Sequence, residues 1–141
     1  MKALYVETSS ILSWLLGEAR GEEVRQILDS ASHVVTSGLT LLEANRALIR
    51  YQAQGGIREA EKQRAIGLLA QVASGWSVME ISETIRNRAG LAFPSEPVRS
   101  LDAIHLATAL EFASAFSEVI ILSFDDRVRI NARMLGLALA G

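Results

Sequence analysis

Short apolar runs alternate with longer amphipathic segments along this chain of 141 residues. The apolar runs are typical of buried strands. The runs that predict strands are residues 3–6, 33–36, 76–79, 119–122 and 137–140. Between them, a helical spacing of apolar positions or a terminating glycine predicts helices. These helices are expected over residues 10–16, 22–28, 40–54, 57–72, 82–90, 100–116 and 125–135.

The order of these elements predicts the fold. Strands separated by helical crossovers imply a parallel sheet with helices on both faces. We therefore expect an α/β fold, a three-layer α/β/α sandwich around a central parallel sheet of four to five strands. No internal repeat or low-complexity tract interrupts the pattern, so residues 1–141 are expected to form a single domain. Hydroxyls should cap three helices: those of residues 8–10, Thr40 and Ser100.

Composition excludes several classes of protein. The chain has no cysteine, which rules out disulfides, thiolate metal sites and cysteine nucleophiles. Its net charge of -2 means that overall electrostatics will not draw it to nucleic acid. The first apolar run is too short for a secretory signal, and no run reaches the roughly 18 apolar residues of a membrane span. We expect a cytoplasmic protein with no membrane association.

Four acidic residues differ from the others because they lie within or directly after apolar runs. They are Glu7, Glu43, Asp102 and Asp125. A carboxylate there is unfavourable to bury unless it is paired or bound to a metal. Because parallel strands end, and the following helices begin, at one edge of a sheet, we expect these carboxylates to surround one crevice. Mg²⁺ or Mn²⁺ would relieve their mutual repulsion, and phosphodiester hydrolysis is the natural chemistry of such a site.

Ordinary structural roles are also open to these acids. Glu43 has arginines three and seven residues further along its helix and could pair with them. Asp102 could be a carboxylate that favours a helix start, and Asp125 or Asp126 could cap the last helix. Glu7 has the weakest ordinary explanation, because caps favour Asp, Asn or Ser.

Four segments resemble the motifs of the PIN-domain family, particularly the VapC-like toxins of bacterial toxin–antitoxin pairs. ALYVETSSIL resembles the opening strand and turn, and SGLTLLEANRAL resembles the second motif. RSLDAIHLATAL is the closest match, and VIILSFDDRVRINARMLGL resembles the last motif. The resemblance places the family's acids on the four residues named above and its supporting hydroxyls on Ser9 and Ser123.

This resemblance implies a metal-dependent endoribonuclease, the toxin of a toxin–antitoxin pair, with Mg²⁺ or Mn²⁺ held by Glu7, Glu43, Asp102 and Asp125. It also implies an RNA substrate, a small antitoxin partner and a homodimer. Glu7 departs from the family pattern, which has Asp there, and its carboxylate reaches one methylene further. We therefore expect an altered metal preference that favours Mn²⁺. The alternative is a catalytically weakened PIN-like binding module that acts through dimerisation and a protein partner.

Four further residues have two interpretations each. His105, three residues after Asp102, could be a ligand, but its apolar neighbours favour a buried structural role. Arg99 and Arg127 flank the acids and could contact RNA phosphates or form surface ion pairs. Trp14 lies among leucines and could pack in the core or contact a second copy or an antitoxin.

Other phosphate-handling folds lack their residues here. Haloacid-dehalogenase-like phosphatases need Asp-x-Asp after the first strand, and this chain has VETSS. Response-regulator receivers need a late lysine, whereas the only lysines are Lys2 and Lys62.

Overall fold

The computed structural model describes residues 1–141 and contains five strands and seven helices in the predicted order. The strands are β1 (Lys2–Val6), β2 (Val34–Ser37), β3 (Ser77–Met79), β4 (Glu118–Leu122) and β5 (Ala138–Leu139). The helices are α1 (Thr8–Leu15), α2 (Gly21–Ser30), α3 (Gly38–Ala53), α4 (Glu59–Ala73), α5 (Glu83–Ala89), α6 (Ser100–Phe112) and α7 (Asp126–Met134). The predicted α/β fold with a central parallel sheet is therefore confirmed.

All the strands are parallel, and their order in the sheet is β3-β2-β1-β4-β5. The chain starts in the middle with β1, moves outward through β2 and β3, and returns to the other side of β1 for β4 and β5. Strand order thus reverses at β1, where open α/β sheets form a crevice at their carboxyl edge. Val6 pairs with Leu122, and the Glu7 N–H donates to the Leu122 carbonyl at 3.0 Å. Glu7 and Ser123 therefore leave the sheet next to each other.

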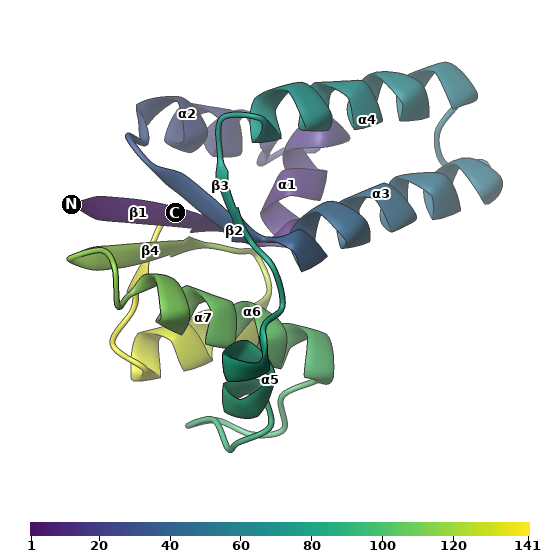
Figure 1. Ribbon diagram of the computed structural model, residues 1–141. Coiled ribbons are helices and arrows are strands. Elements are labelled where there is room, and N and C mark those ends of the chain that lie inside the picture. The colour runs from purple at the N-terminus through teal and green to yellow at the C-terminus, as the bar shows by residue number, and fades with distance from the viewer.

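Helices cover both faces of the sheet (Figure 1). Successive side chains of a strand point to opposite faces, and β1 divides its residues accordingly. Ala3 and Tyr5 belong to the core beneath α6 and α7, whereas Leu4 and Val6 belong to the core beneath α1, α2 and α4. Two apolar layers of this kind give the three-layer sandwich.

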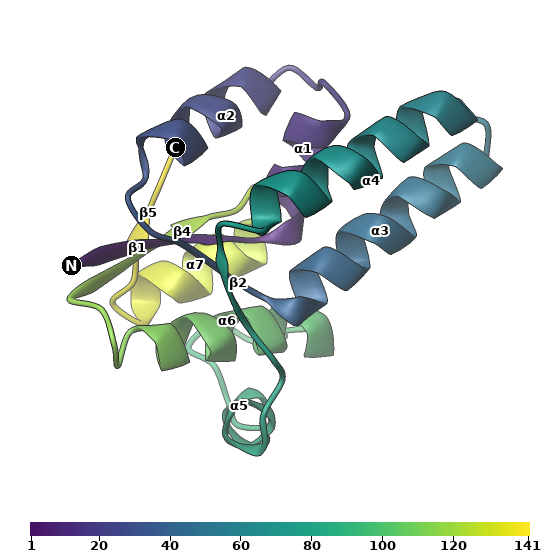
Figure 2. The same ribbon diagram turned by 45° about the horizontal axis from the view of Figure 1, so that its top comes forward.

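Helices α3 and α4 form an antiparallel pair that extends beyond the sheet (Figures 1 and 2). With 16 residues, α3 is about 24 Å long. Its first turns lie at the carboxyl edge of the sheet. Its remaining turns project beyond that edge and form, with α4, a ridge, called the α3 ridge below. None of the helices combines the length and apolarity needed to cross a bilayer.

Three predicted helix caps were wrong. Helix α1 begins at Thr8 with Glu7 as its cap, because the longer Glu side chain folds back and accepts from the Ser9 N–H at 3.2 Å. Helix α3 is capped by Ser37, and Thr40 instead accepts a buried hydrogen bond from Thr36. Helix α6 begins at Ser100, so the Ser100 hydroxyl lies inside the helix and does not cap it. The helix expected from residue 82 is capped by Ser82, whose hydroxyl accepts from the Ile85 N–H at 3.2 Å.

Candidate active site

The four acids predicted from the sequence line one cleft at the carboxyl edge of the sheet. The cleft has a volume of about 500 Å³. Glu7 comes from the end of β1, Glu43 from α3, Asp102 from the first turn of α6 and Asp125 from the start of α7. Residues distant in sequence therefore converge because four elements end or begin there. Glu43 lies one turn further into its helix than the sequence predicted.

Glu7 is buried and held by three donors, none of them a cation. The Ser9 hydroxyl and the Ser123 hydroxyl donate to its Oε1 at 2.5 and 2.6 Å, and the Ser9 N–H donates to Oε2. The Ser123 oxygen also accepts from the Asp125 N–H at 3.1 Å. Both serines predicted to support the site thus fix one carboxylate, and Ser123 links it to the turn that carries Asp125.

Glu43 is held by a threonine and a histidine. Thr8 Oγ1 donates to its Oε1 at 2.7 Å, and His105 Nε2 lies 2.6 Å from the same oxygen. Burial opposes ionisation of Glu43, but the hydrogen bonds from His105 and Thr8 outweigh it and hold its pKa below the usual value. The arginine pairing that the sequence left open does not form, because the only ion-pair partner of Glu43 is this histidine.

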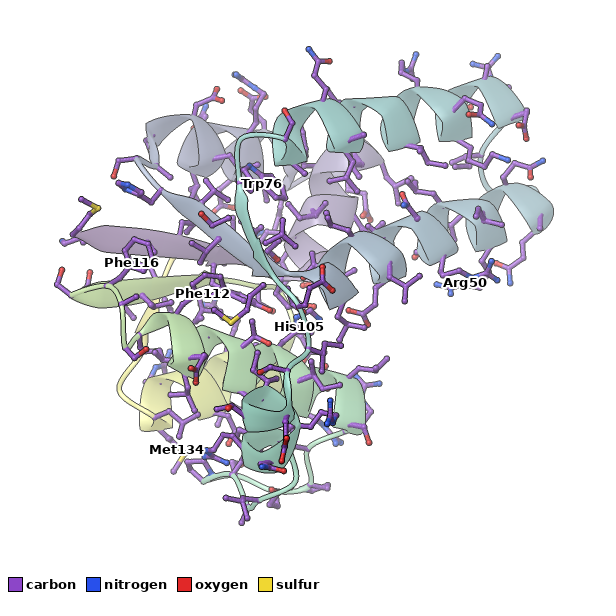
Figure 3. All side chains as sticks on the ribbon, viewed as in Figure 1. Arg50, Trp76, His105, Phe112, Phe116 and Met134 are labelled. Atoms are coloured by element: carbon purple, nitrogen blue, oxygen red, sulfur yellow. The ribbon has the colours of Figure 1, made fainter.

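His105 forms the centre of a buried chain of hydrogen bonds that runs from Tyr5 through His105 to Glu43, named the buried relay. Its side chain lies between α6 and the sheet and is only 2% exposed (Figure 3). The Tyr5 hydroxyl is 2.8 Å from Nδ1. Burial raises the pKa of Tyr5 well above its usual range, so the hydroxyl keeps its proton. In the tautomer that carries the ring proton on Nε2, the hydroxyl donates to Nδ1 and Nε2 donates to Glu43. The predicted buried structural role is confirmed, and the structure adds its contact with a site carboxylate.

Asp102 and Asp125 share one guanidinium. Arg99 Nε donates to Asp102 Oδ2 at 3.1 Å, and its Nη2 donates to Asp125 Oδ2 at 3.4 Å. The hydrogen bond to Asp102, together with both negative charges, raises the pKa of Arg99. Asp125 is also the cap of α7, since its Oδ1 accepts from two backbone N–H groups of that helix. The neighbouring Asp126 is exposed and lies outside the cleft.

The donors suit a hard cation, although they are not yet gathered around one. No three acidic or histidine side chains stand close enough to hold a metal ion in this arrangement. Even so, every acid offers oxygen, the donor that Mg²⁺ and Mn²⁺ prefer. Asp102 Oδ1 and Glu43 Oε2 have no hydrogen-bond partner in the protein and are not buried, so both are open to a ligand. The guanidinium of Arg99 supplies positive charge between Asp102 Oδ2 and Asp125 Oδ2.

Two cleft arginines were missed as functional candidates by the sequence reasoning. Arg46 and Arg50 line the cleft from α3, four residues apart, and neither forms an ion pair. Arg50 projects from the underside of the α3 ridge in Figure 3. Their spacing from Glu43 along one helix face was the available signal, but the sequence analysis considers it only for pairing with that acid. Arg127 donates to the Pro97 carbonyl at 3.2 Å and lies outside the cleft.

Residues 4–133 match the PIN domain. The chain belongs to the PIN-domain family. This PIN domain is 30% identical over 137 residues to ribonuclease VapC35 of Mycobacterium tuberculosis, a match that covers 96% of this chain and 93% of that protein. The family predicted from the sequence motifs is therefore confirmed.

Solved structures agree in fold. The crystal structure of Mycobacterium tuberculosis VapC20, described as a sarcin–ricin loop cleaving toxin, matches this PIN domain with a TM-score of 0.66 at 16% identity, over 90% of this chain and 93% of that one. A toxin–antitoxin complex from Klebsiella pneumoniae matches with a TM-score of 0.66 at 17% identity, over 99% of this chain and 96% of that one. At this level of identity, the two likenesses concern the fold alone.

Proposed function

We propose that this chain is a divalent-metal-dependent endoribonuclease, the toxin of a toxin–antitoxin pair. The observation that carries the proposal is the convergence of Glu7, Glu43, Asp102 and Asp125 on one cleft of a PIN domain related to a named ribonuclease. The four carboxylates would hold Mg²⁺ or Mn²⁺. A bound ion supplies the Lewis acidity that activates water and phosphate for in-line attack.

The surrounding residues support this chemistry in separate ways. Donors from the chain hold the two glutamates in defined orientations at the cleft. Arg46 and Arg50 extend positive charge along the cleft wall, where it would contact RNA phosphates. A local patch of this kind is needed because the net charge of the whole chain is -2. Cleavage of cellular RNA would place this activity in the cytoplasm.

A matched pair of Asp→Asn variants tests the proposal. Labelled RNA is incubated with Mg²⁺ or Mn²⁺, with and without EDTA. Asp102→Asn should abolish cleavage because it removes a proposed ligand, whereas Asp126→Asn should leave cleavage within about twofold because Asp126 lies outside the cleft. Cleavage that survives EDTA or Asp102→Asn would refute the proposed site.

The metal preference depends on Glu7. Its extra methylene lets the carboxylate fold back onto α1 and be tied by three donors, an arrangement unlike a free ligand. Mg²⁺ demands near-ideal octahedral geometry, so we expect Mn²⁺ to support faster cleavage than Mg²⁺. Glu7→Asp should raise the Mg²⁺-supported rate relative to the Mn²⁺-supported rate. An unchanged ratio of the two rates would remove this part of the proposal.

A catalytically weakened binding module is the second candidate. It is favoured by the tethered Glu7 and by the guanidinium that already occupies Asp102 and Asp125. In that case no RNA would be cut with either metal, while the chain would still form a stable complex with the product of an adjacent gene. Co-expression of the two genes followed by size-exclusion chromatography makes the distinction.

We also propose a homodimer and a small antitoxin partner. The likeness to a toxin–antitoxin complex supports the antitoxin. A second copy would cover exposed apolar side chains at the cleft rim, where Leu42 and Leu101 are 59% and 48% exposed. Trp14 is a weaker contact candidate, because it is part-buried and packs on the core beneath α2 and α4. Light scattering should give the mass of two chains, and Leu42→Asp should halve it.

A further inference from the structure

Arg99 occupies the position between two proposed metal ligands. Its guanidinium reaches Asp102 in the first turn of α6, which Arg99 directly precedes, and Asp125 at the start of α7, at 3.1 and 3.4 Å. The side chain of Arg99 is 69% exposed, whereas that of Asp102 is 10% exposed. A solvent-exposed cation thus bridges two less exposed carboxylates.

The backbone that carries Arg99 is anchored independently of this side chain. Glu96 accepts from the Phe93 N–H at 2.8 Å and from the Val98 N–H at 2.7 Å, which closes the preceding turn. Asn131 on α7 both accepts from and donates to the backbone of Ser95. The guanidinium can therefore leave the carboxylates by side-chain rotation, with no movement of the main chain.

The guanidinium of Arg99 faces solvent, so another cation can replace it without any opening of the core. A destination for the released guanidinium is also available. A divalent ion and a guanidinium would repel each other strongly at the same oxygens. Arginine binds phosphate oxygens in a bidentate manner, and a phosphate held near the ion would present them.

We propose that Arg99 is an exchangeable counter-ion: it neutralises Asp102 and Asp125 in the metal-free protein and transfers to an RNA phosphate when a divalent ion enters. The inference rests on the proposed function, because it requires that ion. It explains why no cluster of metal ligands is assembled in the structure even though the four acids share a cleft. Arg46 in the same cleft contacts no acid and offers a comparison with equal charge.

The first measurement is Mn²⁺ binding without RNA, followed through the electron paramagnetic resonance signal of free Mn²⁺. Arg99→Gln removes the competing cation and should tighten the Mn²⁺ dissociation constant about tenfold, equivalent to about 1.4 kcal/mol. Arg46→Gln removes the same charge without freeing a carboxylate and should change it less than about twofold. Asp102→Asn should abolish binding, which ties the signal to this cleft.

The second measurement is RNA binding, followed by fluorescence anisotropy of a labelled single-stranded RNA dodecamer. With saturating Ca²⁺, and with the RNA shown to be intact on a gel, Arg99→Gln should weaken binding about fivefold. The dependence of log affinity on log salt should become shallower by about 0.7, the value for one lost phosphate contact on a single strand. In EDTA the same variant should bind RNA like the parent chain, because Arg99 is then engaged by the two aspartates.

The outcomes separate the two proposals. If the parent chain binds Mn²⁺, Asp102→Asn does not, and Arg99→Gln binds with unchanged or weaker affinity, the role of Arg99 as a counter-ion is wrong while the metal site stands. An RNA-binding defect of Arg99→Gln that is equal in Ca²⁺ and EDTA would overturn the transfer to phosphate. If neither the parent nor Arg99→Gln binds Mn²⁺, the metal site is refuted and the inference falls with it.

Discussion

Replacing Tyr5 and His105 separately and together tests whether the buried relay holds Glu43. Tyr5→Phe removes only the hydroxyl and leaves His105 Nδ1 buried without a donor, which should destabilise the protein by about 1–2 kcal/mol. His105→Leu leaves the buried tyrosine hydroxyl without its acceptor and removes one charge-assisted donor from Glu43. Its expected effect is larger, about 3–4 kcal/mol.

The double variant distinguishes a relay from two independent contacts. Once both polar partners are gone, neither is left buried and unsatisfied, so the double variant should lose about 1–2 kcal/mol less than the two single losses combined. Urea unfolding gives the free energy of unfolding of the parent, the two single variants and the double variant, analysed with one common m-value. Additive losses, within about 0.3 kcal/mol, would refute the relay.

The other histidine provides a matched control. His33 Nδ1 is buried but makes no hydrogen bond, and the ring packs against Phe116 with centroids 5.7 Å apart. His33→Leu should therefore change stability by less than about 1 kcal/mol and be additive with Tyr5→Phe. It also leaves a single histidine for nitrogen NMR, which should report a ring proton on Nε2. His105→Leu removes the hydrogen bond that orients the Glu43 carboxylate, so it should weaken Mn²⁺ binding about 10–100-fold.

Three further changes follow from the hydrogen bonds of the site. Thr8→Val removes a donor from Glu43, so its pKa should rise. Because the folded-state pKa of Glu43 lies below the ordinary 4.5, its carboxylate stabilises the parent above that pH, and this stabilisation disappears as the pH falls through the lowered value. Thr8→Val should reduce this acid-dependent loss of stability in thermal melts taken at decreasing pH below 4.5. Asn131→Ala breaks both hydrogen bonds to Ser95, and urea unfolding should give a loss of about 2–3 kcal/mol, with faster proteolysis of that loop. Ser123→Ala should weaken Mn²⁺ binding about tenfold, and unchanged binding would show that its hydroxyl does not position the site.

The order of elements and the convergence of the acids were predictable from the sequence. The strand runs are short and apolar, and glycines such as Gly17 and Gly55 follow the helices, so the alternation was easy to detect. Parallel topology then required Glu7 and Asp125 to lie at one edge. Helix starts were less predictable, because several hydroxyls within a few residues can each serve as a cap. Ser37 and Thr40 are two such hydroxyls, and the prediction named Thr40, whereas Ser37 is the cap.

Contacts between side chains of different elements could not be predicted in this way. The approach of His105 to Glu43 depends on how α6 and α3 meet across the sheet edge, and no local spacing encodes it. The bridge from Arg99 to Asp125 likewise joins residues 26 positions apart. The sequence placed both residues near the acids but left their partners open.

Glu7 and Asp125 each begin a helix as well as line the cleft, whereas Glu43 and Asp102 lie inside helices that start without them. If expression of this chain halts growth, survivors will carry escape mutations that silence it. Changes at Asp102 or Glu43 should yield inert protein whose helices still have their caps, while changes at Glu7 or Asp125 should also loosen a helix and lower the amount of protein in the cell further. Escape variants at the two pairs of acids would then differ in protein abundance on a blot, although a change at any of the four positions abolishes the same activity.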